Sequence, residues 1–294
     1  MILVAGATGL VGREICRLLL EKKKPLRAMT RRGSNAALVD DLKKRGAEVV
    51  TADLKDRASL DAACRNVDTV ISTVSSTLSR QEGDSIESVD RQGQIALIDA
   101  AKAAGVKRFI LVSFNHERTA KCALADAKSA AEQRLIKSGM EYTIFRPSFF
   151  MEVWLSPNLG FDAANGKATI YGDGERPVSW ISLFDVAAFA VASVDNPQAR
   201  NQILGIGGPE GVSPNEIVRV FENATGRKFE VQRVPEAALQ AQYDSAADPM
   251  QRSFAALMLL CAKGDAIDMS KTAKNFSIRP KSVREFARSV TAGR

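Results

Sequence analysis

The residues with the clearest chemical potential are the glycines that follow the first apolar run. Three of them stand in the segment Gly6-Ala7-Thr8-Gly9-Leu10-Val11-Gly12, between that run and a helical pattern. Glycine lets the backbone turn sharply and approach a pyrophosphate, and the next helix offers its free N–H groups to that charge. A strand–turn–helix setting is the context that confirms such a motif. We therefore expect residues 6–12 to bind a dinucleotide.

Two arginines follow the second apolar run, Leu26–Thr30. An NAD(H) site needs a carboxylate there, roughly 20 residues beyond the glycines, to hold the ribose 2′-hydroxyl. The sequence has Arg31 and Arg32 instead. A planar guanidinium matches phosphate oxygens with a fork of donors, so the pair favours a 2′-phosphate, although one or both could point to solvent. The predicted cofactor is therefore NADP(H).

Two further segments follow apolar runs in the same way. Asp53 and Leu54 come after the third run, and Ser72, Thr73 and Val74 come at the end of the fourth. Open α/β sheets bind ligands beyond the carboxyl ends of their strands. We expect Asp53 and Leu54 to bracket the adenine, and residues 72–74 to pass beside the ribose and nicotinamide. Either segment could equally be ordinary loop.

Short apolar runs alternate with helical patterns over the first 150 residues, which predicts a parallel sheet flanked by helices. The expected strands are Ile2–Ala5, Leu26–Thr30, Glu48–Thr51, Thr69–Ser72, Phe109–Ser113 and Tyr142–Arg146. The expected helices lie near Gly9–Glu21, Ala36–Arg45, Ala58–Arg65, Val89–Ala104 and Asp126–Ser138. The fold class predicted is α/β, a doubly wound parallel-sheet Rossmann fold over residues 1–155. Residues 156–294 are expected to form a smaller C-terminal α/β substrate lobe, with segments near 181–208 returning to the Rossmann sheet.

The composition is that of an ordinary globular protein. The 294 residues are 45% hydrophobic and 26% charged, and the net charge is +7. Aromatic residues make up only 6% and do not interleave with the basic clusters, so we expect no nucleic-acid partner. The widely spaced cysteines predict reduced thiols and no metal site. No apolar run is long enough to span a membrane, and the first strand leaves no room for a signal peptide, so we expect a cytoplasmic protein.

The chain resembles the NmrA-like group of atypical short-chain dehydrogenase/reductases over nearly its whole length. The matching features are Gly6–Gly12, Arg31, Asp53-Leu54, Ala100–Val112, Lys128, Ser138–Phe150, Asp185-Val186-Ala187 and Gly207-Gly208-Pro209. The resemblance implies a Rossmann fold and NADP(H) binding. It is weak for the reaction, because the group includes quinone reductases and isoflavone- or lignan-type reductases as well as redox-sensing regulators and assembly factors. With these matches, the predicted cofactor contacts also include Lys128 and Pro147.

The catalytic residues are harder to predict. Many short-chain dehydrogenases pair a tyrosine with a lysine four residues later on one helix face, so that the phenol can trade a proton with the substrate. Here Lys128 fits the lysine position, but Leu124 stands where the tyrosine would be. Lys128 could itself be the acid–base group, or His116 could be, since the pKa of an ordinary histidine suits proton transfer near neutrality. Alternatively, solvent protonates the anion that hydride transfer produces, and both residues have other roles.

Aromatic residues gather after the sixth predicted strand and could line a pocket for a flat, apolar substrate. The predicted substrate contacts are Phe114, Phe149, Phe150 and Trp154. They could also be core residues. The leading hypothesis is an NADPH-dependent oxidoreductase that reduces a small conjugated or aromatic carbonyl compound such as a quinone. The alternative is a non-enzymatic NADP(H)-sensing regulator or assembly factor, and a homodimer or a protein partner stays open.

Overall fold

The computed structural model describes residues 1–78 and 81–291. The chain divides into two compact units, which are described separately. Unit 1 comprises Met1–Phe114, Ala123–Arg146 and Ala187–Leu204. Unit 2 comprises Asn115–Cys122, Pro147–Val186 and Gly205–Arg294, of which the last three residues are not described.

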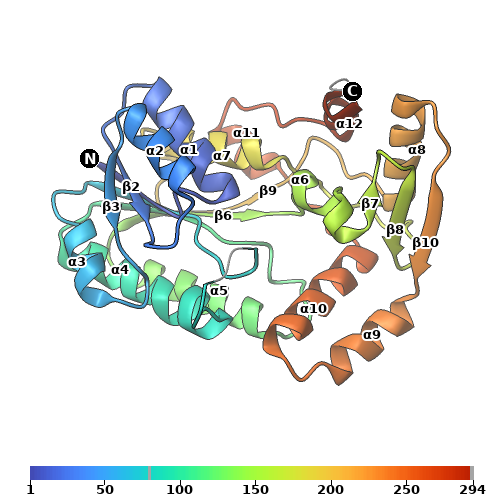
Figure 1. Cartoon of the computed structure of the whole chain (residues 1–294), viewed down its shortest axis with the longest axis horizontal. Coiled ribbons are helices and arrows are strands. Elements are labelled where there is room, and N and C mark those ends of the chain that lie inside the picture. The colour runs from blue at the N-terminus through green and yellow to red at the C-terminus, as the bar shows by residue number, and fades with distance from the viewer. Residues whose placement is uncertain (79–80, 292–294) are drawn as a thin grey trace. The chain divides into compact units, whose positions relative to one another are not determined.

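A seven-stranded sheet in the order β3-β2-β1-β4-β5-β6-β9 organises unit 1 (Figure 1). Its strands are β1 (Ile2–Ala5), β2 (Leu26–Thr30), β3 (Glu48–Thr51), β4 (Thr69–Ser72), β5 (Arg108–Val112), β6 (Glu141–Pro147) and β9 (Gln202–Ile206). The pairings from β3 through β6 are parallel. The central strands are fully buried, as strands covered on both faces must be, whereas edge strand β3 is partly exposed. The predicted α/β Rossmann architecture is confirmed.

The register of the central strands brings three loops to one edge of the sheet. Ala5, the last residue of β1, lies opposite both Met29 of β2 and Ser72 of β4. The loops that begin at Gly6, Arg31 and Thr73 therefore leave the sheet at nearly the same level. This is the carboxyl edge, where sheets of this kind bind ligands.

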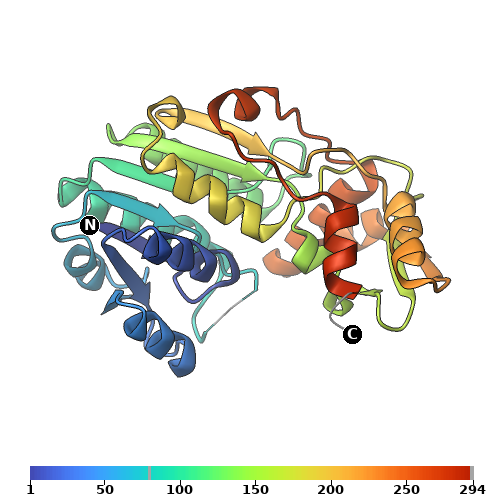
Figure 2. The same ribbon diagram turned by 90° about the horizontal axis from the view of Figure 1, so that it is seen from above.

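Helices cover both faces of this sheet, as two views at right angles show (Figures 1 and 2). One face carries α1 (Leu10–Glu21), α2 (Ala36–Lys44) and α7 (Leu183–Ser193); the other carries α3 (Arg57–Ala63), α4 (Gln94–Ala103) and α5 (Ala123–Ile136). The sequence predicted one helix near Val89–Ala104, and the structure corrects this. A π-helical segment, Ile86–Gly93, precedes α4, and such segments are frequent at functional sites.

Unit 2 is built around a smaller sheet in the order β10-β8-β7. Its strands are β7 (Phe161–Asp162), β8 (Lys167–Tyr171) and β10 (Glu230–Val234). Its helices are α6 (Met151–Trp154), α8 (Pro214–Thr225), α9 (Glu236–Ser245), α10 (Pro249–Lys263), α11 (Ser270–Asn275) and α12 (Val283–Thr291). Helix α8 begins with a reciprocal capping box between Ser213 and Glu216 and with Pro214 at the first position.

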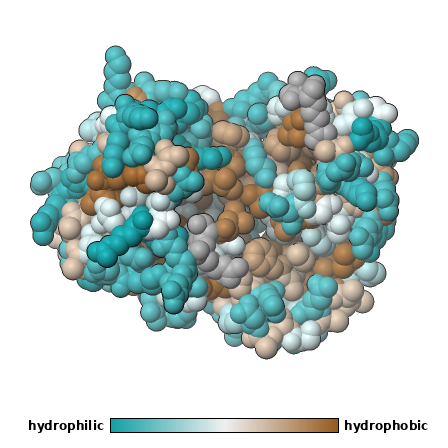
Figure 3. Space-filling model, in the orientation of Figure 1, coloured by the Kyte–Doolittle hydropathy of each residue, from teal (hydrophilic) through white to brown (hydrophobic). Residues whose placement is uncertain are grey.

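Each unit buries its own apolar cluster. In unit 1 Leu97, Phe109 and Ile144 are among the buried residues between sheet and helices, and in unit 2 Phe161 and Phe221 pack edge to face. All four cysteines are buried and unbonded, as expected. Hydrophilic residues cover much of the face drawn in Figure 3. Within the described ranges, no helix has the length and apolarity needed to cross a membrane.

Candidate functional site

The glycine turn between β1 and α1 has the geometry that a phosphate cradle requires. Gly6 has a φ of +84°, and the N–H of Gly9 donates to its carbonyl oxygen at 2.9 Å. A Cβ at Gly12 would lie 2.0 Å from the Gly6 oxygen, so no other residue fits without moving the backbone. Among the residues that the structure describes, no side chain caps α1, and its first turn holds no acidic residue. The positive end of the helix is thus available to an anion.

Arg31 lies at the same edge and shares a buried carboxylate with a residue that sequence reasoning missed. Its Nη1 donates to Asp84 Oδ2 at 2.5 Å, and Lys55 Nζ pairs with Asp84 Oδ1. Arg31 and Lys55 follow the adjacent strands β2 and β3. Arg32, by contrast, is exposed. The structure therefore joins Arg31 and Lys55 through Asp84, and the binding of a 2′-phosphate by Arg31 and Arg32 stays a prediction.

The two residues predicted to bracket the adenine differ in their surroundings. Asp53 is half-buried and accepts the backbone N–H of Lys55 at 2.8 Å through one carboxylate oxygen. Leu54 is buried in the unit 1 core and packs closely against Gly93, where a Cβ would lie 2.7 Å from that of Leu54. Contact of either residue with adenine stays a prediction.

Residues 72–74 divide between the core and the site edge. Ser72 is fully buried and donates to Gln94 at 3.1 Å. Thr73 Oγ1 would lie 2.8 Å from a Cβ at Gly6, and the Val74 carbonyl accepts a hydrogen bond from Lys128 Nζ at 3.2 Å. Thr73 and Val74 thus connect the glycine turn to the predicted catalytic lysine.

Lys128 is held in a buried ion pair. Its Nζ lies 2.9 Å from Asp90 Oδ1; Asp90 is completely buried and Lys128 is only 5% exposed. Asp90 stands in the π-helical segment, and its other oxygen accepts the backbone N–H and the hydroxyl of Ser76. Burial alone would raise the pKa of Asp90, but the Lys128 ammonium and the Ser76 donors outweigh it and hold that pKa below its usual range. Asp90 is therefore ionised and is the counter-ion of Lys128.

Ser113 is a second residue that sequence reasoning did not assign. It directly follows β5, on the carboxyl edge. Its hydroxyl is buried, and within residues 1–78 and 81–291 it has no hydrogen-bond partner. Buried hydroxyls are nearly always bonded to protein, water or a ligand. An unsatisfied hydroxyl at this edge therefore fits a ligand-binding role.

The predicted aromatic substrate contacts in unit 2 pack mainly on one another. The Phe149 and Trp154 rings meet edge to face at 4.6 Å, and Trp180 lies 5.9 Å from Phe149. Trp154 lines a cavity of about 30 Å³, which has room for water but not for an aromatic ring. A substrate role for Phe149 and Trp154 stays a prediction, as it does for half-buried Phe150.

The remaining predicted site residues are distributed over both units. Phe114 ends the first segment of unit 1, whereas His116 and Pro147 belong to unit 2. His116 stands next to Asn115, whose amide donates to the buried carboxylate of Asp265 at 2.6 Å. The roles predicted for these three residues remain untested. Among the described residues no cluster of three or more histidine, cysteine or acidic side chains forms a metal site.

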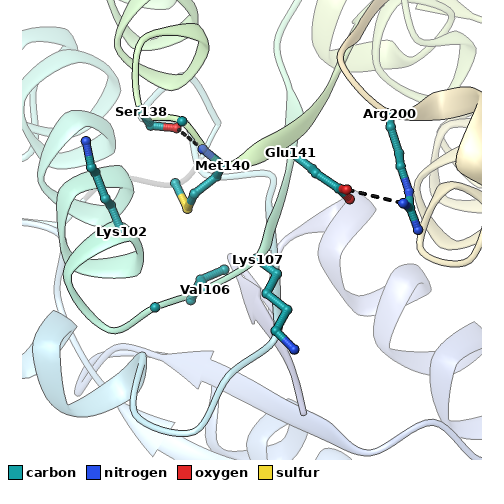
Figure 4. Close-up of a pocket in the computed structure, with 9 residues that line it drawn as sticks. Lys102, Val106, Lys107, Ser138, Met140, Glu141 and Arg200 are labelled. Carbon is teal, nitrogen blue, oxygen red and sulfur yellow. Dashed lines mark hydrogen bonds and ion pairs between the residues drawn. The ribbon is translucent and has the colours of Figure 1, made fainter.

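An open depression of about 650 Å³ occupies a different part of unit 1 (Figure 4). Lys102, Lys107 and Arg200 are among its lining residues, and the Arg200 guanidinium pairs with Glu141 at 3.2 Å. It lies next to the start of β5 and β6, at the amino ends of these strands. Since open α/β sheets bind their cofactors at the carboxyl ends, this depression is separate from the glycine turn and Lys128.

Comparison with known proteins adds relatives of two kinds. The chain is 34% identical over 229 residues to the NAD(P)H azoreductase of Xenophilus azovorans, and the matched region covers 77% of this chain and 74% of the relative. It is 29% identical over 235 residues to the photosystem II assembly factor Ycf39 of Trieres chinensis, covering 80% and 72%. The crystal structure of the NADPH-dependent quinone oxidoreductase QOR2 of Escherichia coli, complexed with NADPH, matches with a TM-score of 0.80 at 25% identity over 99% of both chains.

The model of the NmrA-like family matches residues 1–287, which is nearly the whole chain. The matched region includes the glycine turn, Arg31, Asp90 and Lys128. The resemblance expected from the sequence is thus confirmed, and the chain belongs to the NmrA-like family.

Proposed function

We propose that this protein is an NADP(H)-dependent oxidoreductase that reduces a small, planar, conjugated or aromatic compound such as a quinone. The observation that carries the proposal is the set of groups on the carboxyl edge of unit 1. An uncapped glycine turn, the Arg31–Lys55 cation pair and the buried Lys128 each match one part of the cofactor. The relatives named as NAD(P)H azoreductase and NADPH-dependent quinone oxidoreductase support the same class of reaction.

Each part of the edge has its own binding task. Gly6, Gly9 and Gly12 let the backbone and the α1 N-terminus approach the pyrophosphate. Arg31 and Lys55 bind the 2′-phosphate through charge-assisted hydrogen bonds. Lys128 Nζ donates to the Val74 carbonyl and pairs with the Asp90 carboxylate, and a further donor of the ammonium can serve a ribose hydroxyl.

The protein's contribution to the reaction is orientation and charge. Bound NADPH supplies the hydride. The Lys128 ammonium, held in place by Asp90, stabilises negative charge that develops beside it. Leu124 is buried one helical turn earlier and has no proton to give, so phenol-dependent carbonyl chemistry does not apply. A quinone suits such a site, because solvent can protonate the hydroquinone anion.

Replacing Ser113 by alanine tests whether the carboxyl edge holds a ligand. The Ser113 hydroxyl has no bond within the described protein, so its removal is expected to change the free energy of unfolding by less than about 0.5 kcal/mol. Affinity for NADPH or for the electron acceptor is expected to fall by about three- to tenfold, the value of one neutral hydrogen bond. Chemical denaturation and steady-state kinetics measure the two quantities. Lower stability with unchanged ligand affinities would contradict the assignment.

A regulator or assembly factor that binds NADP(H) without turnover is the second candidate. Two observations favour it: Leu124 stands where a catalytic tyrosine would be, and the Ycf39 assembly factor is among the relatives. The two functions differ in turnover, not in cofactor binding. A panel of quinones, azo dyes and aromatic aldehydes, incubated with NADPH and followed by the loss of reduced nicotinamide, separates them. Consumption with a quinone supports the oxidoreductase; tight NADPH binding with no consumption supports the second candidate.

A further inference from the structure

One carboxylate occupies the position between the two cations assigned to the 2′-phosphate. The Asp84 side chain is 1% exposed. Its carboxylate forms ion pairs with Arg31 Nη1, at 2.5 Å, and with Lys55 Nζ. The backbone N–H of Gln81 also donates to it, at 2.8 Å. Burial alone would raise the pKa of Asp84, but Lys55, the Gln81 N–H and Arg31 outweigh burial and hold that pKa below its usual range. The carboxylate is therefore ionised at neutral pH.

This arrangement has opposite consequences for the two dinucleotides. A 2′-phosphate needs donors of Arg31 and Lys55, each of which already gives one donor to Asp84, and it also meets a negative charge at close range. A ribose 2′-hydroxyl carries no charge, and a carboxylate is the group that NAD(H) sites use to accept it. Asp84 thus weakens the advantage that the two cations give to the phosphorylated cofactor.

We propose that Asp84 is a specificity-determining residue, which lowers the preference for NADPH over NADH by competing with the 2′-phosphate for Arg31 and Lys55. The inference rests on the part of the proposed function that places the 2′-phosphate at these two cations. It does not depend on which substrate is reduced or on whether turnover occurs.

A purely structural role for Asp84 makes a different prediction. Asp84 and Gln81 also close a turn, in which the N–H of Asp84 donates to the Gln81 carbonyl at 3.0 Å. Loss of that turn would alter the binding of both cofactors by a similar factor. The ratio of the two affinities therefore separates competition from structural support.

The test is calorimetric titration of NADPH, NADH, 2′,5′-ADP and 5′-AMP into the full chain and its Asp84→Asn variant. Asparagine keeps an oxygen for the Gln81 N–H but removes the charge. We expect NADPH and 2′,5′-ADP to bind about tenfold more tightly, because one repulsive charge is removed from a buried site. NADH and 5′-AMP are expected to bind as before or more weakly. Unchanged or weaker NADPH binding, or equal changes for all four ligands, would overturn the proposal.

Two further variants complete the experiment. Asp61→Asn makes the same change in net charge at an exposed pair with Arg57, and it is expected to leave all four affinities unchanged. If Asp84→Asn is poorly folded, Asp84→Ser replaces it, because the serine hydroxyl can also close the turn. Asp84→Ser should then raise the NADPH-to-NADH affinity ratio. If Arg31→Ala leaves the affinity for 2′,5′-ADP unchanged, the assignment of the phosphate site is wrong. If Arg31→Ala weakens it and Asp84→Asn has no effect, only the role of Asp84 is wrong.

Discussion

Arg31→Ala is expected to weaken NADPH binding by about 10- to 100-fold and NADH binding by less than about threefold. The guanidinium contributes a charge-assisted hydrogen bond to the 2′-phosphate, worth about 1.5–3 kcal/mol, which NADH cannot form. Asp84 keeps Lys55 as a partner in the variant, so its carboxylate is not left unpaired in the protein. Calorimetric titration of the two cofactors gives the ratio directly.

Arg32 provides the matched control for Arg31. It has the same side chain at the next position but is exposed. Arg32→Ala is therefore expected to change both cofactor affinities by less than about threefold, as for a solvent-screened surface charge. If Arg32→Ala lost more NADPH affinity than Arg31→Ala, Arg32 and not Arg31 would be the residue that binds the 2′-phosphate. Equal losses of NADPH and NADH affinity in Arg31→Ala would remove the phosphate assignment altogether.

Asp90→Asn is expected to destabilise the protein by about 3–5 kcal/mol, because it leaves the buried Lys128 ammonium without its counter-ion. Asparagine can still accept the backbone N–H and the hydroxyl of Ser76. Urea denaturation followed by circular dichroism measures the loss. Adding Lys128→Met is expected to restore most of the stability, because the unpaired charge is then gone. If Asp90→Asn alone were as stable as the wild type, that result would contradict the ion pair.

The same variant separates the positioning role of Asp90 from a structural one. If Asp90 holds the Lys128 ammonium in position, Asp90→Asn lowers NADPH affinity as well as stability. A matched control is Glu132→Gln, which breaks the buried Arg146–Glu132 pair one turn further along α5 without removing the counter-ion of Lys128. That variant should lose stability while its NADPH affinity stays unchanged. Equal effects of the two variants on NADPH affinity would make the role of Asp90 purely structural.

The Asp90–Lys128 pair also predicts how stability depends on pH. The pKa of Asp90 is lower in the folded protein than the unfolded value of about 4. The contribution of Asp90 to the free energy of unfolding is therefore complete above that pH, and it is lost as the pH falls through the pKa of Asp90 in the folded protein. At acidic pH, the free energy of unfolding of Asp90→Asn should accordingly depend less steeply on pH than that of the wild type.

Much of unit 1 could be predicted because its signals are local. Strands β1 to β4 were predicted at the bounds observed, since each is a short apolar run next to a helical pattern. The Gly6–Gly12 turn was predicted because close backbone approach leaves glycine as the only fit at Gly12. Arg31 was predicted from its position at the end of β2. In each case the neighbouring residues carry the information.

The partners of the site residues could not be predicted, because long-range contacts determine them. Asp84 reaches Arg31 across 53 positions of sequence, through a loop with no pattern of its own. Asp90 stands in a segment that the sequence predicts as ordinary α-helix, but the structure has a π-helical segment there, with Gly93 against Leu54 and Asp90 paired with Lys128. Lys55 does have a local signal, since it stands in the loop after β3, the strand next to the one that Arg31 follows.

The most direct test of the central claim is the rate at which the protein oxidises NADPH and NADH with a simple quinone as acceptor. The Arg31–Lys55 site predicts turnover in which kcat/KM for NADPH exceeds that for NADH by about tenfold or more, with the Arg31→Ala variant losing that preference. Equal values of kcat/KM for the two cofactors would contradict the phosphate site. No oxidation of either cofactor, by protein that binds NADPH tightly, would contradict the oxidoreductase.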